Sequence, residues 1–167
     1  MKRKTYILMM SAFVLLGCSQ GKKPANAKAQ QQATSQTEVA ADSVKDGEGK
    51  VVYLSTEDFR KRVMDYQAHH QDWVFNGTKP AIVDFYATWC HPCKMMSPIV
   101  EQLAKKYAGK IDFYKVDIDK EQDVANAFDI QSIPTFFFVP VKGNPQIQMG
   151  AMEKEEFERI ITSVLLK

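Results

Sequence analysis

The stretch Trp89-Cys90-His91-Pro92-Cys93-Lys94, written W-C-H-P-C-K, places two cysteines three positions apart midway along the chain. Such a pair can bind a metal, brace the fold or exchange electrons with another disulfide. A closed zinc site needs four ligands, and a disulfide framework needs more than one bridge. The pair is therefore expected to do exchange chemistry.

The residues on either side of the pair predict a strand followed by a helix. Residues 81–87 are apolar except for Asp84, a pattern typical of a strand that is covered on both faces. Pro98 falls inside the helix predicted after the pair, where it removes a backbone hydrogen bond and is expected to cause a kink. The apolar residues of that helix recur on one face: Met96, Ile99, Val100, Leu103, Ala104 and Tyr107.

The chain from residue 51 onward alternates between strand and helix patterns. Ser55 is expected to cap a helix that carries Phe59, Val63 and Tyr66 on one face. The order β-α-β-α-β-α-β-β-α predicts an α/β fold with a mixed central sheet flanked by helices. The other strands are expected over 51–54, 111–116, 135–139 and 146–149, and the other helices over 121–128 and around 157–165.

Residues 67–79 fit neither the strand nor the helix pattern. They include His69, His70 and Trp73, which invite a metal-binding interpretation. Neighbouring histidines on an irregular polar stretch are more often simply solvated, so no metal site is expected here.

The N-terminus has the pattern of a secretory signal. The basic start Met1-Lys2-Arg3-Lys4 is followed by an apolar run over 6–16, which is too short to span a bilayer as a mature helix. The sequence Leu15-Leu16-Gly17-Cys18 resembles the lipoprotein box of bacteria, which implies that residues 1–17 are removed and that Cys18 carries lipid. The alternative is an ordinary signal peptide or membrane anchor with an incidental cysteine. A lipid on Cys18 would explain the odd number of cysteines, because Cys90 and Cys93 then form a pair.

Residues 18–50 are expected to form a disordered, lipid-anchored linker, and residues 51–167 a single domain. From residue 19 to 50 there is no aromatic residue and no Leu, Ile or Met, so the segment cannot bury enough apolar surface to offset its ordering entropy. The net charge of the chain is +2, of which the eight basic and four acidic residues before Val51 contribute +4. The domain itself is slightly acidic, which argues against a nucleic-acid partner.

Several separated segments resemble the thioredoxin family, and together they cover nearly all of 51–167. They are 82–90, 93–98, 115–119, 132–135 and 150–152. The resemblance implies a thioredoxin fold and a thiol–disulfide oxidoreductase that needs no cofactor beyond the Cys90–Cys93 disulfide. The chain departs from the family at His91-Pro92, where Gly-Pro is common, and in the longer segment 67–79.

The expected catalytic residues follow from this resemblance and from helix physics. Cys90 at the helix start would be stabilised as a thiolate by the helix dipole and would attack the substrate disulfide, and Cys93 would resolve the mixed disulfide. By resemblance, Asp84 lies behind Cys93 and assists its deprotonation through a water molecule, with Lys115 as its neighbour. The alternative for Asp84 is a structural carboxylate whose hydrogen bonds are satisfied.

The expected substrate-binding residues border the pair: Trp89, His91, Pro92, Ile133, Pro134 and Gly150. By resemblance, the Ile133–Pro134 bond is cis and presents the Ile133 backbone to a substrate strand. Gly150 would let the substrate backbone approach closely. Trp89 covers the site or belongs to the core, and His91 either stabilises the Cys90 thiolate or is merely solvated.

The sequence as a whole predicts a lipid-anchored thiol–disulfide oxidoreductase that faces the periplasm from the bacterial cell envelope. Its partners would be disulfide-containing envelope proteins and a membrane electron donor or acceptor. Disulfide reduction or exchange is favoured, with disulfide oxidation or isomerisation as the alternative. A third possibility is a Cu(I)-binding module of the same fold, although no histidine follows His91 to serve as a further ligand.

Overall fold

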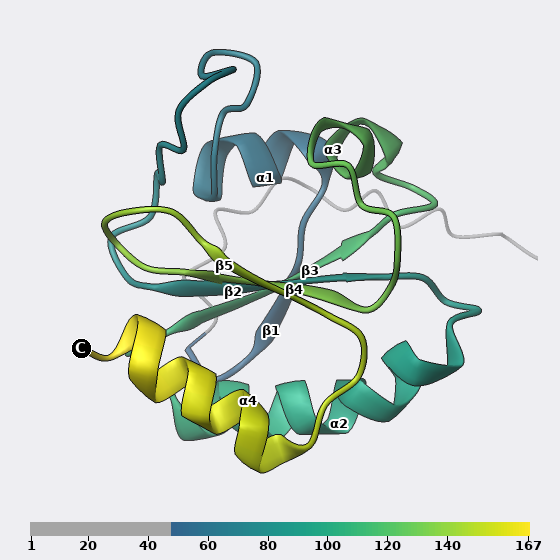
Figure 1. The fold of residues 1–167 in the computed structure, drawn as a ribbon, viewed down its shortest axis with the longest axis vertical. Coiled ribbons are helices and arrows are strands. Elements are labelled where there is room, and N and C mark those ends of the chain that lie inside the picture. Colours follow the sequence, from purple (N-terminus) through teal and green to yellow (C-terminus); the bar gives the residue numbers. More distant parts are fainter. Residues whose placement is uncertain (1–47) are drawn as a thin grey trace, which may run out of the picture. The chain divides into compact units, whose positions relative to one another are not determined.

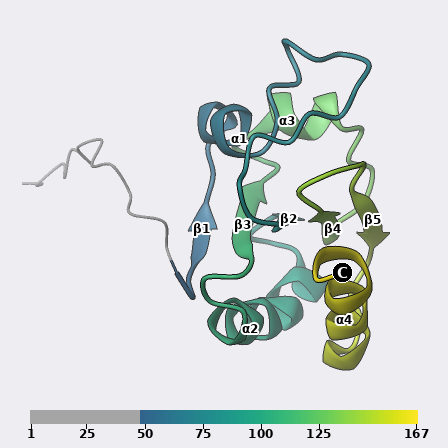
Figure 2. The same cartoon turned by 90° about the vertical axis from the view of Figure 1, so that its left-hand side faces the viewer.

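The computed structural model describes residues 48–167, in which five strands form one mixed sheet of order β1-β3-β2-β4-β5. The strands β1, β3 and β2 run parallel, whereas β4 is antiparallel to β2 and β5 is antiparallel to β4. Figure 2 shows β1 and β5 at the two edges of the sheet. The predicted mixed sheet is therefore confirmed. The strands are β1 (Val51–Tyr53), β2 (Ala81–Tyr86), β3 (Asp112–Asp117), β4 (Thr135–Val139) and β5 (Gln146–Met149).

Helices cover both faces of the sheet (Figure 1). The helices α1 and α3 lie on one face and α2 and α4 on the other. The last predicted helix is divided, because α4 passes directly into a wider π-helical turn, η1. The helical elements are α1 (Thr56–Arg62), α2 (His91–Lys106), α3 (Gln122–Ala127), α4 (Lys154–Ile160) and η1 (Ile161–Leu165). The predicted signal peptide over 1–17, the lipidation site Cys18 and the linker up to residue 47 lie outside the described residues.

The core has two halves because the central strands are buried on both faces. Successive side chains of a strand point to opposite faces, so Phe136 and Phe138 pack beneath α2 and α4 while Phe137 packs toward α1 and α3. In β2, Ile82 joins the first group, and Val83 and Phe85 join the second. Because both faces of β2 and β4 are covered, their sequences are nearly continuous apolar runs and do not alternate between apolar and polar residues.

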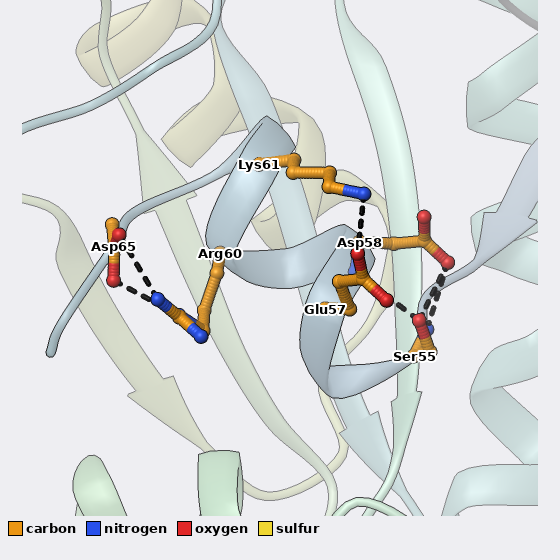
Figure 3. Close-up of polar contacts among 6 residues, drawn as sticks. All are labelled: Ser55, Glu57, Asp58, Arg60, Lys61 and Asp65. Carbon is orange, nitrogen blue, oxygen red and sulfur yellow. Dashed lines mark hydrogen bonds and ion pairs between the residues drawn. The ribbon is translucent and has the colours of Figure 1, made fainter.

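The helix α1 is shorter than its apolar spacing predicts. It ends at Arg62, and Tyr66 lies in the turn beyond it, although its ring still packs 6.4 Å from that of Phe59. Figure 3 shows one contact that shapes this exit, a double hydrogen bond from the Arg60 guanidinium to the Asp65 carboxylate. These hydrogen bonds lower the pKa of Asp65 below its ordinary value. Pro98 lies inside α2 as predicted, and a bend of the helix at that point remains a prediction.

The irregular segment 63–80 is held by aromatic packing. The ring of Trp73 lies 5.8 Å from that of Phe128 and 6.3 Å from that of Phe137. His69 and His70 are exposed. The segment leads into the start of β2, whereas the cysteine pair follows the end of β2. A six-residue strand spans roughly 20 Å, so the segment and the pair lie at opposite ends of the sheet.

Candidate functional site

The site is built around a disulfide between Cys90 and Cys93 at the start of α2. Cys90 is the N-cap residue, with extended backbone, and its Sγ accepts a hydrogen bond of 3.1 Å from the backbone N–H of Cys93. Pro92 occupies the first turn, where a helix needs no backbone N–H from it. Unpaired N–H groups of a helix start stabilise negative charge, so this position favours a thiolate on Cys90 when the disulfide is reduced.

One distant segment lies against the disulfide, and a second is hydrogen-bonded to the first. The Sγ of Cys90 is 3.8 Å from the carbonyl oxygen of Ile133, and the Ile133–Pro134 peptide bond is cis, as predicted. The backbone N–H of Gly150 donates a hydrogen bond of 2.7 Å to the carbonyl oxygen of Pro134. Gly150 has a φ of 88°, and a side chain placed there would meet no atom within 4 Å, so the surface above it is open. The fold thus brings residues 90, 133, 134 and 150 together.

The disulfide itself is nearly covered, while its neighbours are exposed. The exposed fraction is 4% for Cys90 and 1% for Cys93. His91 and Pro92 are exposed on the first turn of α2. Trp89 is 66% exposed and its Nε1–H donates a hydrogen bond of 2.8 Å to the Asp119 carboxylate. This placement excludes the core alternative for Trp89. Together, the exposed residues Trp89, His91 and Pro92 form the rim of the disulfide.

Asp84 is buried at the centre of the sheet. It lies on β2 with an exposed fraction of 0%, directly across from Lys115 on β3, with which it forms an ion pair. The Asp84 Oδ2 is the atom that accepts from the Lys115 ammonium group, whereas Oδ1 is buried and has no hydrogen-bond partner within residues 48–167. Burial raises the pKa of the Asp84 carboxyl group, and the Lys115 charge opposes that rise. The group is thus suited to hold a proton at a higher pH than an exposed aspartate.

Tyr86 and Ser97 complete the surroundings of Lys115: Tyr86 was expected to pack beside Trp89 or in the core, and no role was expected for Ser97. The Lys115 Nζ lies 4.6 Å from the centre of the Tyr86 ring and 3.4 Å from Ser97 Oγ. Burial and the nearby Asp117 charge raise the pKa of Tyr86 to about 12. Ser97 could have been found from its spacing, because a residue four positions after Cys93 lies on the same face of the helix.

A hollow between α2 and residues 151–153 is rich in methionine. The backbone N–H of Met152 points to the Met96 sulfur at 3.5 Å, and Met95 is exposed at the same place. Met149 at the end of β5 is also exposed. Unbranched thioethers adapt to varied surfaces, which suits contact with different polypeptides. The lining residues are Met95, Met96, Ile99, Ala151, Met152 and Glu153.

Residues 48–167 contain no group of three or more His, Cys, Asp or Glu side chains placed to hold a metal ion. In the same part of the chain, no helix is both long and apolar enough to cross a membrane.

Comparisons with a family model, with known sequences and with solved structures all find thioredoxins. A family model described as Thioredoxin matches residues 50–163. A thioredoxin of Borreliella burgdorferi is 53% identical over 110 residues, which cover 66% of this chain and 93% of that protein. The chloroplastic M-type thioredoxin of Spinacia oleracea is 38% identical over 84 residues, which cover 50% of this chain and 46% of that protein, or about half its length. The crystal structure of chloroplastic thioredoxin z shares 25% sequence identity with a TM-score of 0.59, covering 71% of this chain and 96% of that chain.

Proposed function

This chain belongs to the thioredoxin family and is a protein-disulfide oxidoreductase, and we propose that it reduces or exchanges disulfides of proteins in the bacterial cell envelope. The main support for this reaction is the Cys90–Cys93 disulfide at the start of α2. The Cys90 Sγ lies 3.8 Å from the Ile133 carbonyl oxygen. The pair is thus a redox couple at a helix N-terminus, beside a backbone segment that can receive a substrate strand.

In the reductive direction, the Cys90 thiolate attacks one sulfur of a substrate disulfide. A mixed disulfide forms, and one substrate thiolate leaves. The Cys93 thiolate then attacks the Cys90 sulfur, which forms the Cys90–Cys93 disulfide and releases the second substrate thiolate. Two electrons have passed to the substrate, and the oxidised protein is the state described above.

Asp84 is proposed to accept the proton of Cys93 through a water molecule, with Lys115 as its charge partner. A carboxyl group with a raised pKa exchanges protons near neutral pH more readily than an ordinary aspartate does. The position of Oδ1 supports this role, because no group within residues 48–167 donates a hydrogen bond to it and it is able to accept one from a water molecule.

Substrate docking is proposed along the exposed rim of the disulfide. The Ile133 backbone would pair with an extended substrate segment, Gly150 would leave room for its backbone, and Trp89 would lie against its side chains. His91 and Pro92 contribute the exposed first turn of α2 to the same rim.

The cellular location rests on the N-terminal sequence. The basic start, the short apolar run and Leu15-Leu16-Gly17-Cys18 support export and lipid attachment at Cys18. Attachment there would place the catalytic domain near the membrane on the periplasmic side, where a membrane electron donor is required for sustained reduction.

One observation favours the opposite direction, oxidation or isomerisation. His91 is exposed next to Cys90 at the start of α2, where an imidazolium would stabilise the reduced thiolate and raise the reduction potential. By contrast, no observed ligand cluster within residues 48–167 favours the Cu(I)-binding alternative.

The activity is tested with the full-length chain in mild detergent, using insulin as the disulfide substrate and dithiothreitol as the electron source. We expect the wild type to reduce insulin and Cys90→Ser to lose activity. Cys93→Ser, first reduced and then freed of dithiothreitol, should accumulate a mixed disulfide with insulin through Cys90. Equilibration against glutathione then fixes the direction, with a potential near roughly −270 mV for a reductant and roughly −120 to −180 mV for an oxidant or isomerase. Full activity of Cys90→Ser would overturn the proposal.

A further inference from the structure

Ser97 connects the buried ion pair to the cysteine-bearing turn. It lies on α2 four residues after Cys93, and its hydroxyl group donates a hydrogen bond of 3.1 Å to the Cys93 carbonyl oxygen. The Ser97 Oγ itself lies 3.4 Å from Lys115 Nζ and accepts a hydrogen bond from it. Lys115 in turn pairs with Asp84. A continuous chain of polar contacts therefore runs from the Asp84 carboxylate to the first turn of α2.

The local helix does not account for a serine at this position. In a helix interior, serine stabilises the helix less than alanine does. A hydrogen bond from the serine hydroxyl group to the carbonyl oxygen four residues earlier adds no helix stability. The Lys115 side chain is only 5% exposed, and a buried ammonium group needs acceptors for its N–H groups. Asp84 Oδ2, Ser97 Oγ and the face of the Tyr86 ring surround this ammonium group. The serine hydroxyl is thus matched to the lysine rather than to the helix.

We propose that Ser97 is a positioning residue of the exchange reaction, which holds the Lys115 ammonium group between Asp84 and the Cys93 turn. The role of this contact in catalysis rests on the proposed function, because it acts through the carboxylate that would accept the Cys93 proton. The contact itself does not rest on it.

The position of the Lys115 ammonium group affects the proton affinity of Asp84. Burial raises the pKa of that carboxyl group and the Lys115 charge counteracts the rise, so a less well held ammonium group lets the pKa rise further. Removing the Ser97 hydroxyl takes one acceptor from Lys115 and is expected to act in this direction. The titratable and charged groups around this cluster are Asp84 and Tyr86 on β2, Lys115 and Asp117 on β3, and Tyr53 on β1. Cys90 and Cys93 at the start of α2 titrate only when their disulfide is reduced.

The test is the full-length protein with Ser97→Ala, assayed for insulin reduction as a function of pH. We expect the acidic limb of the rate profile to move to higher pH by about half to one unit, which is a loss of about three- to tenfold at a fixed pH on that limb. In the oxidised protein, the Asp84 titration followed by carboxyl ¹³C NMR should move by the same amount and in the same direction. Ser97→Thr keeps a hydroxyl group and should restore both values toward the wild type.

A matched control is Thr162→Ala. The Thr162 hydroxyl donates to the Glu158 carbonyl oxygen four residues earlier, at 2.9 Å on the exposed side of the C-terminal helix. The Thr162→Ala substitution removes the same kind of hydrogen bond and leaves the contacts of Lys115 unaltered. It should therefore change neither the pH profile of the rate nor the Asp84 titration.

The outcomes separate the two proposals. An unchanged or lowered Asp84 titration in Ser97→Ala would overturn the positioning role, even if the wild type reduces insulin normally. Failure of the wild type to reduce insulin would overturn the proposed function, and the NMR titration would still decide the role of Ser97 because it needs no turnover.

Discussion

Asp84 shows how one buried residue can carry a cost to stability. It is a fully buried carboxylate in a strand whose other members are apolar, and its ion pair with Lys115 leaves one oxygen without a partner among the residues that the structure describes. Burying a charge is unfavourable unless pairing offsets the loss of hydration. The raised pKa indicates that, for this carboxyl group, the loss of hydration outweighs the attraction of Lys115.

This imbalance predicts a pH-dependent stability. The pKa of Asp84 lies above its ordinary value of 3.8 in the folded protein, so between these two values the folded state binds more protons than the unfolded state. The free energy of unfolding should therefore fall as the pH rises from about 4 through the folded pKa, and then level off. Denaturant unfolding of the oxidised protein across this range should show the decline in the wild type and a flatter curve in Asp84→Asn.

The control for this experiment is Asp72→Asn, which changes an exposed carboxylate in the segment 63–80. It should retain the wild-type pH dependence. A decline of equal size in wild type and Asp84→Asn would show that another group causes it.

At the scale of elements, the helices begin where the sequence provides a cap. At the start of α1, the Ser55 hydroxyl accepts a hydrogen bond of 3.1 Å from the Asp58 N–H, and the Asp58 carboxylate reaches back to the Ser55 N–H (Figure 3). The next residue, Thr56, donates its N–H to the Glu121 carboxylate, which ties this start to the beginning of α3. The cap thus fixes both a helix and its contact with a neighbour.

Loss of this cap predicts a measurable destabilisation. Ser55→Ala should lower the free energy of unfolding by about 1 kcal/mol, within a range of roughly 0.5–2 kcal/mol, because the N-terminal N–H group loses its acceptor. Denaturant unfolding followed by circular dichroism measures the change. Ser163→Ala, which removes a hydroxyl from the C-terminal turn, should change stability less, and equal losses in both variants would contradict the capping argument.

The ends of elements were harder to predict than their starts. The apolar spacing of Phe59, Val63 and Tyr66 suggests a longer α1, yet the chain leaves the helix after Arg62. Tyr66 satisfies the same apolar contact from a turn, since its ring meets both Phe59 and Phe128. The apolar spacing indicates which residues face the core. A side chain can reach the core from a turn as well as from a helix, so the spacing does not determine where the helix ends.

At the scale of the whole molecule, the fold separates the reactive end from the longer segment. The segment 63–80 precedes β2 and the cysteine pair follows it, so the departure at 67–79 leaves the rim of the disulfide untouched. Figure 1 shows this segment rising beside α1, away from the start of α2. The effect of this segment on partners would therefore be exerted at the far end of the domain.

The proposed lipid anchor makes a prediction for the intact protein in bacteria. Cys18→Ser should abolish labelling by a radioactive fatty acid and move the protein from the membrane fraction to the soluble fraction. The insulin reduction rate of the purified protein should stay the same, because the cysteine pair is unaltered. Cys90→Ser serves as the control that keeps the label, and a labelled Cys18→Ser variant would contradict lipid attachment at Cys18.

The sequence alone was enough to predict the order of the elements, the two-sided burial of β2 and β4, and the position of the cysteine pair. These are local properties, because periodicity, caps and the Cys-His-Pro-Cys spacing are written in neighbouring residues. The family resemblance already placed Ile133, Pro134 and Gly150 beside the pair. Tertiary structure supplied the contacts themselves, Ile133 at Cys90 and Gly150 at Pro134, and it alone decided the contact of Ser97 with Lys115. Such contacts depend on the registers of three strands and the packing of α2 against the sheet, and no local pattern encodes a distance between residues so far apart in sequence.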